Sequence, residues 1–339
     1  VDQASHDAYT GCQQAPMSAQ FKQHLKPVDQ PSVDHASTIL RDESTGGCPF
    51  LSDGWCGIQN TLGESWLSDV CAGYPRLSLR LGDLLFQSMS LSCPEAARLA
   101  LTEPDAFDFV APSIPIRQSD IRVVPTPWAL TLEQMQNVHF LGVQVVRTTE
   151  LALWERLMCI GLLCENLRPL FTTKQFDGLG EVLGGIEAVV QSGELKGICQ
   201  TMAGDPAVQA AFFRSLWRLG GTIGANAAQR DIQGIVDRAA MFNVSGAEQD
   251  VEVLTNRYLE GIGRLNQVEG AQRLMEHAVI NDMLQDLFPF SGAEPMQNYL
   301  KLISRFGLLR WILAQIAYDL GEQCNLTHLV QATQQFHRR

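Results

Sequence analysis

The sequence predicts a mainly α protein, in which a small cysteine-rich N-terminal lobe precedes an irregular helical bundle. Apolar side chains recur every three or four residues through most of the chain after Thr131, which is the spacing of one helix face. Five cysteines fall earlier, in sequence broken by glycine and proline: Cys12, Cys48, Cys56, Cys71 and Cys93. No repeat with a period of about 20 to 50 residues occurs, which argues against a solenoid. We therefore predict a metal or cluster lobe at 1–93 and a helical domain at 94–339.

Composition narrows the classes of partner. The 339 residues carry a net charge of −12, which argues against a general nucleic-acid binder because phosphate contacts need a basic surplus. An acidic surface would attract lysine-bearing substrates, or it serves solubility alone. The sequence has no apolar run of about 18 residues and no signal-peptide pattern, so we predict a cytoplasmic protein that binds no membrane.

The first 47 residues are polar and interrupted by prolines, and we expect them to pack around the cysteines that follow. A short amphipathic helix is predicted near Met17 to Leu25. Ser37 to Arg41 has β-branched residues between turn residues, which predicts one strand of a small hairpin.

Cys48, Cys56 and Cys71 indicate a soft-metal site. Thiolates bind zinc and iron-sulfur clusters well, and an odd total of nine cysteines argues against a disulfide framework. The spacing, Cys48-x7-Cys56-x14-Cys71, differs from the C-x2-C pair of a zinc finger and predicts ligands brought together from separate loops. The alternative is that the three are small buried residues of a loop-rich lobe. Cys159 and Cys164 lie in an apolar helical pattern and are predicted to be core thiols.

Two helices are predicted next, at Leu77 to Ser92 and from Pro94. Leu81, Leu84, Leu85 and Met89 have helical spacing, and Pro94 with Glu95 is typical of a first helical turn. Cys93 would then cap a helix N-terminus, where the helix dipole favours a thiolate. This makes Cys93 a candidate fourth ligand, with a buried capping residue as the alternative.

Five prolines between 102 and 128 predict an extended connector, and the chain is expected to be helical from Thr131 onward. Thr131 and Gln134 fit a capping box. Leu153 to Phe171 carries the apolar stripe of one long helix, and 295–320 has apolar residues on several faces, which predicts a central buried helix. The other helices are predicted near 175–192, 206–219, 226–242, 247–265, 269–287 and 326–337.

The sequence motifs around the cysteines resemble those of the flagellin lysine-N-methylases. They are Cys48-Pro-Phe-Leu, Asp53-Gly-Trp-Cys-Gly-Ile-Gln, Leu62-Gly-Glu, Leu67-Ser-Asp-Val-Cys and Tyr74-Pro-Arg. The likeness continues into Ser90 to Leu101 and returns more weakly at Tyr299 to Leu313. The family's usual upstream segment, with its C-x-x-x-C-C pattern, is not in this chain, which opens at Val1. Part of the family's cluster site is therefore not accounted for.

The resemblance implies methyl transfer from S-adenosylmethionine to lysines of flagellin, assisted by a cysteine-bound iron-sulfur cluster of the 4Fe-4S type, with zinc as the alternative metal. Such a reaction requires a neutral lysine amine, and aromatic hydroxyls suit its channel. Tyr74 is therefore a candidate catalytic residue, and Arg76 a candidate contact to the donor carboxylate. The alternative for Tyr74 is a packed aromatic residue without a catalytic role, and the alternative for Arg76 is an ion pair with an acidic residue.

No common donor-binding loop supports this function. Asp177 to Gly185 is rich in glycine but follows no predicted strand, so we interpret its glycines as helix breaks or close-packing positions. A competing hypothesis is a non-catalytic scaffold, in which the metal is structural and a helical groove binds a partner protein.

Overall fold

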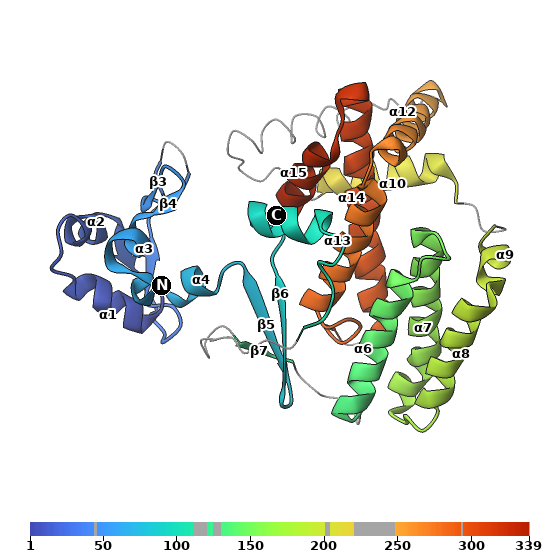
Figure 1. Cartoon of the computed structure of the whole chain (residues 1–339), viewed down its shortest axis with the longest axis horizontal. Coiled ribbons are helices and arrows are strands. Elements are labelled where there is room, and N and C mark those ends of the chain that lie inside the picture. The colour runs from blue at the N-terminus through green and yellow to red at the C-terminus, as the bar shows by residue number, and fades with distance from the viewer. Residues whose placement is uncertain are drawn as a thin grey trace. The chain divides into compact units, whose positions relative to one another are not determined.

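A computed structural model describes residues 1–43, 46–110, 121–124, 130–200, 204–219, 248–292 and 294–338 (Figure 1). The fold is mainly α, as predicted. The chain divides into two compact units, one of Val1–Ser78 with Ala111–Arg122 and the other of Leu79–Val110 with Val123–Arg339. The division thus follows Ser78, whereas the sequence predicts a boundary after Cys93; the roles assigned to the two predicted domains stay predictions.

The first unit is built from short elements around a small aromatic core. Its helices are α1 (Gln3–Gly11), α2 (Met17–His24), α3 (Gly57–Leu62), the 3-10 turn η1 (Glu64–Trp66) and α4 (Asp69–Gly73). Two antiparallel pairs accompany them, β1 (Leu25–Pro27) with β2 (Ser37–Ile39), and β3 (Leu51–Ser52) with β4 (Trp55–Cys56). Tyr9 stacks on Phe21 with ring centroids 4.3 Å apart, and Phe50 contacts Phe21. The predicted helix near Met17 and the strand at Ser37 are both confirmed.

The predicted helix at Leu77 to Ser92 is wrong. This segment forms β5 (Arg76–Leu81) and β6 (Leu84–Met89), and β5 is the middle strand of a sheet ordered β6-β5-β7, with β7 at Ile121–Val123. The physical reason lies in the turn between the strands. Gly82 has φ +59°, which ends a helix, and the leucines of β5 alternate with polar residues in the period of a strand.

The second unit is a helical bundle (Figure 1). Its helices are α5 (Pro94–Thr102), α6 (Leu132–Arg147), α7 (Leu153–Thr173), α8 (Leu179–Ser192), α9 (Glu194–Gln200), α10 (Pro206–Leu219), α12 (Glu248–Gln267), α13 (Ala271–Gln285), α14 (Pro295–Leu320), the 3-10 turn η3 (Gly321–Gln323) and α15 (Leu326–Phe336). The predicted helices therefore exist, except that 226–242 lies outside the described residues. The capping box of Thr131 with Gln134 is confirmed at the start of α6.

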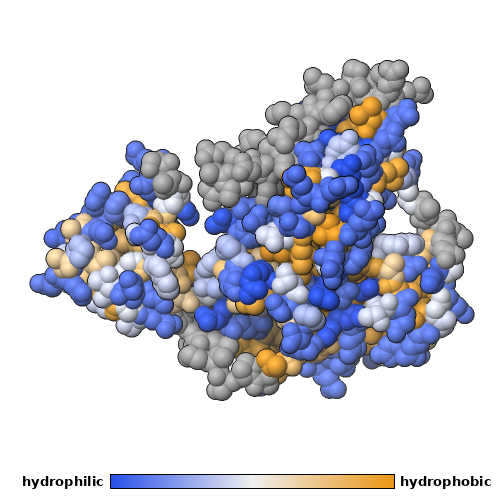
Figure 2. Space-filling view, turned by 45° about the horizontal axis from the view of Figure 1, so that its top comes forward, coloured by the Kyte–Doolittle hydropathy of each residue, from blue (hydrophilic) through white to orange (hydrophobic). Residues whose placement is uncertain are grey.

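Helix α14 lies at the centre of the bundle, as predicted, and packs against α7, α10, α12, α13 and α15. Its Trp311 to Ala317 are all buried in one hydrophobic core. Cys159 and Cys164 are buried in the same core, as predicted. Hydrophilic residues cover much of the helical unit on the face shown in Figure 2, and hydrophobic residues appear there as separate patches. Among the described residues, none of the helices has the length and hydropathy to span a bilayer.

Three of the four glycines of 177–185 are not helix breaks, whereas Gly178 is the N-cap at which α8 begins. Gly180, Gly184 and Gly185 lie inside α8, and a Cβ placed on any of them would meet nothing within 4 Å. They are therefore not close-packing positions either.

Candidate functional site

The three predicted ligands of the first unit come from three separate local structures, as expected. Cys48 precedes the turn into β3, Cys56 ends β4 and is the N-cap of α3, and Cys71 lies in α4. A tight β3–β4 turn, with Gly54 at φ +82°, sets Leu51 opposite Cys56. The side chains of Cys48 and Cys71 are exposed, and that of Cys56 is half-buried.

Hydrogen bonds from α1 and its N-cap hold the start of α4, and with it Cys71, in place. The Asp69 N–H donates to Asp2 Oδ2 over 3.1 Å, and the Ser68 N–H donates to Tyr9 Oη over 3.0 Å. Tyr9 is buried, and this burial, with the neighbouring Cys71, raises the pKa of Tyr9 to about 12. Tyr9 is therefore a neutral structural hydroxyl under ordinary conditions.

The electrostatics of Cys48 indicate that its thiol is within interaction range of the thiols of Cys71 and Cys56. Cys48 is exposed as a residue, but partial desolvation of its thiol raises its pKa, and the thiols of Cys71 and Cys56 raise it further because thiolates repel one another. A soft cation would relieve this repulsion, so the donor set fits a thiolate-bound metal in its chemistry. Across the residues that the structure describes, however, no three His, Cys, Asp or Glu side chains are grouped as a metal site. Metal binding by these cysteines stays a prediction.

Cys93 belongs to the second unit, as the N-cap of α5, where its side chain is half-buried. Its peptide is fixed there, because the Cys93 N–H donates to Ser90 O over 3.2 Å and Gln334 Nε2 donates to Ser92 O over 2.5 Å. The capping position is therefore confirmed, while its role as a fourth ligand is a prediction. Tyr74, 48% exposed, is the C-cap of α4, and Arg76 is exposed at the start of β5. The catalytic roles of both likewise stay predictions.

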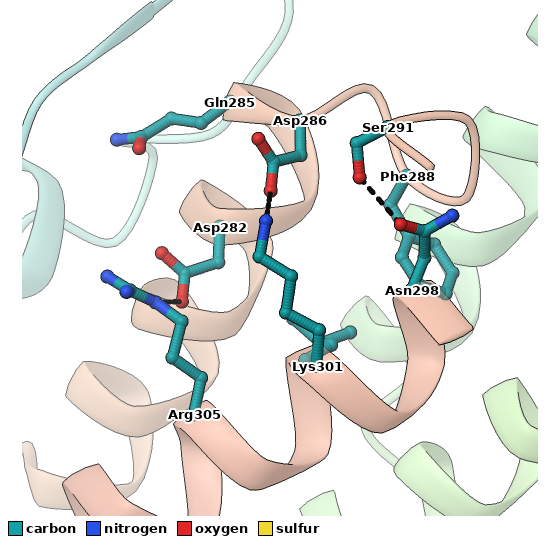
Figure 3. Close-up of a pocket in the computed structure, with 9 residues that line it drawn as sticks. Asp282, Gln285, Asp286, Phe288, Ser291, Asn298, Lys301 and Arg305 are labelled. Carbon is teal, nitrogen blue, oxygen red and sulfur yellow. Dashed lines mark hydrogen bonds and ion pairs between the residues drawn. The ribbon is translucent and has the colours of Figure 1, made fainter. Parts of the chain in front are cut away.

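Sequence reasoning missed a pocket of about 210 Å³ between α13 and the N-terminal half of α14 (Figure 3). Helix α13 and its C-cap contribute Asp282 and Asp286, and α14 contributes Lys301 and Arg305. The remaining lining residues are polar or buried apolar groups: Gln285, Phe288, Ser291, Asn298 and Leu302. The signal in the sequence was a pair of acids and a pair of bases, each four residues apart on neighbouring helices.

Both acids of the pocket face a base. Lys301 Nζ lies 2.8 Å from Asp286 Oδ2, and Arg305 Nε donates to Asp282 Oδ2 over 2.8 Å. Arg305 Nη2 also donates to His337 Nδ1 over 2.9 Å, which requires that nitrogen to be unprotonated. Burial lowers the pKa of His337 to about 4, so its ring is neutral near pH 7.

Comparisons with known proteins find one family model and several relatives that resemble this chain. The profile of the FliB lysine N-methylase C-terminal domain matches residues 141–339. The flagellar biosynthetic protein FliU of Salmonella muenchen is 37% identical over 74 residues, which are 22% of this chain and 44% of FliU. The lysine-N-methylases of Salmonella typhimurium strain LT2 and Salmonella choleraesuis strain SC-B67 are also 37% identical over 74 residues, or 18% of their length. The match thus spans less than half of each of these relatives. No solved structure matches.

Proposed function

The chain belongs to the FliB lysine N-methylase family, and from this premise we propose that it acts in the methylation of lysine side chains of flagellin. The observation that carries the proposal is the family match over residues 141–339, which is more than half of the chain. Further support comes from the names of the relatives, because one is a flagellar biosynthetic protein and two are lysine-N-methylases.

The reaction sets requirements for the site. A lysine amine attacks a methyl donor only when it is neutral, and an apolar or cation-repelling surrounding lowers its pKa toward that state. The net charge of −12 would attract lysine-bearing segments to the protein before the reaction. We propose S-adenosylmethionine as the donor, Tyr74 as a hydroxyl beside the amine and Arg76 as a contact to the donor carboxylate.

For the metal, we propose that Cys48, Cys56 and Cys71 are ligands of an iron-sulfur cluster, with Cys93 as a further candidate and zinc as the alternative metal. Support comes from the thiol chemistry and from the mutual proximity that raises the pKa of Cys48. When bound, such a group would supply either redox chemistry or a fold-stabilising centre for the first unit. The exposure of Cys48 and Cys71 leaves the thiols reachable by a metal.

The test is a methylation assay with purified flagellin, labelled S-adenosylmethionine and iron- or zinc-reconstituted protein. We expect labelled methyl-lysine in flagellin, and loss of metal and of product in Cys48→Ser, Cys56→Ser and Cys71→Ser. Cys324→Ser is the matched control, because Cys324 is a half-buried thiol that follows α14 and η3 in the other unit. Absence of product from the metal-loaded wild-type chain would refute the enzyme and favour the scaffold. Metal content unchanged in all three serine variants would refute the ligand assignment.

A further inference from the structure

The pocket between α13 and α14 has walls of opposite charge. Asp282 and Asp286, four residues apart, lie on one face of α13 and its C-cap, and Lys301 and Arg305, also four apart, lie on one face of α14 (Figure 3). Like charges at this spacing repel one another along a helix. The ion pairs between the helices, Asp286 with Lys301 and Asp282 with Arg305, offset this repulsion and line the pocket of about 210 Å³.

The ion pair of Lys301 with Asp286 can be exchanged at low cost. The Lys301 side chain is 61% exposed and that of Asp286 is 34% exposed, and ion pairs in such settings contribute little to stability. The pair of Arg305 with Asp282 is less exposed and is expected to persist. A ligand that offers a carboxylate to the basic wall and an ammonium to the acidic wall would replace each partner of the Lys301–Asp286 pair by an equivalent one. A simple anion or a simple cation would satisfy only one wall and be repelled by the other.

Arg305 is already oriented for such a ligand. Its guanidinium is held by Asp282 and His337 and lies over the Phe336 ring, 5.1 Å from the centroid. Because Nε and Nη2 donate to Asp282 and His337, Nη1 is the nitrogen that would donate to a ligand carboxylate. A guanidinium held in this way loses little conformational entropy on binding.

Asn298 holds the loop that lines one part of the pocket. Its Nδ2 donates to Pro289 O over 2.6 Å, and its Oδ1 accepts from Ser291 Oγ over 2.8 Å, so the α13–α14 loop is tied to α14. The volume of about 210 Å³ corresponds to several water molecules at about 30 Å³ each. This space suits an amino-acid group, and a larger molecule would have to extend into solvent.

We propose that this pocket binds the zwitterionic end of a free amino acid or of a molecule that carries one. The carboxylate would lie against Lys301 and Arg305. The ammonium would lie against Asp282 and Asp286. A lysine within a protein chain is excluded, because peptide bonds remove both of its α charges. Two sources remain, a free amino acid and the methionine end of S-adenosylmethionine. Only the second rests on the proposed function, and it would assign the donor carboxylate to Lys301 and Arg305 in place of Arg76.

The first experiment measures binding by isothermal titration calorimetry on the full chain at pH 7. The probes are L-methionine, S-adenosylmethionine, and methionine analogues that lack either the amino or the carboxyl group. We expect one of the two zwitterions to bind with a single site, and each analogue to bind at least tenfold more weakly. Methionine that binds as tightly as S-adenosylmethionine, or more tightly, identifies a free amino acid as the source, and S-adenosylmethionine that binds at least tenfold more tightly than methionine identifies the donor. No binding of either, or equal binding of the analogues, would overturn the proposal.

A charge exchange separates ligand binding from a structural ion pair. Asp286→Lys combined with Lys301→Asp restores a pair across the pocket, but it places both signs on each wall. We expect unchanged thermal stability and at least tenfold weaker binding, whereas exchanging Glu95 and Arg98, an exposed pair 2.7 Å apart on α5, should leave binding unchanged. Unchanged binding in the pocket exchange would refute the assignment. Binding needs neither metal nor flagellin, so its failure is distinguishable from a failure of methylation.

Discussion

Replacing Gly261 by alanine tests how closely α12 and α14 pack. A Cβ at Gly261 would lie 2.3 Å from Ala314 O and 2.9 Å from its carbonyl carbon, which are backbone atoms of α14. Ordinary contact begins near 3.4 Å, so the helices would have to separate by about 1 Å. Overpacking of this kind costs about 1–3 kcal/mol, and we expect the upper end because the obstructing atoms belong to a helix backbone.

Helix propensity acts in the opposite direction and needs its own control. Alanine stabilises a helix interior relative to glycine by about 1 kcal/mol. Gly263 lies two residues further along α12, and a Cβ there would meet nothing within 4 Å. Gly263→Ala should therefore gain the propensity without the clash. The difference between the two variants, about 3 kcal/mol, isolates the packing cost.

The assay is hydrogen exchange of the α12 and α14 amides, read by mass spectrometry, because local opening free energies avoid assuming that both units unfold together. We expect exchange from α14 to be about a hundredfold faster in Gly261→Ala than in Gly263→Ala, since each tenfold corresponds to about 1.4 kcal/mol. Equal protection in the two variants, or greater protection in Gly261→Ala, would refute the close approach of the helices.

Three further predictions concern the second unit. Burial lowers the pKa of His139 to about 4, below the unfolded value of 6.5, so its contribution to stability is complete above about pH 6.5 and is lost as the pH falls toward 4. Urea unfolding should therefore show that the free energy of unfolding falls between pH 7 and pH 5, and that this fall is about 2 kcal/mol smaller in His139→Asn than in the wild type. The asparagine amide can still donate to Phe288 O. An equal fall in both proteins would contradict the prediction. Tyr258→Phe removes the hydroxyl that accepts from Arg310 Nη1 over 3.1 Å and donates to Gln209 Oε1. It should lower the free energy of unfolding by about 1–2 kcal/mol in the same measurement. No change would show that these hydrogen bonds do not contribute to stability. Thr131→Ala removes the side-chain half of the α6 capping box and should cost about 1 kcal/mol, whereas Thr131→Ser should retain most of it.

Local sequence was enough for the helices of the second unit. The capping pair of Thr131 and Gln134, the proline starts of α5, α10 and α14, and the apolar stripe of α7 act within a few residues of the chain, so their spacing predicts the elements directly. The same reasoning failed at Leu77 to Ser92, where leucines fit both periods and the turn at Gly82 with strand pairing decided for a hairpin.

Features that depend on contacts between distant segments of the chain could be found only in the tertiary structure. The sequence alone specifies the chemistry of the side chains: it shows thiols suited to a soft metal, an acidic net charge, and the family's sequence motifs around Cys48. Only the folded chain holds the start of α4, and with it Cys71, through hydrogen bonds that Asp2 and Tyr9 accept. Only the folded chain also sets the acids of α13 opposite the bases of α14. The reason is physical: spacing along a helix fixes which face a side chain shares, while the partner across a pocket is chosen by how the helices pack.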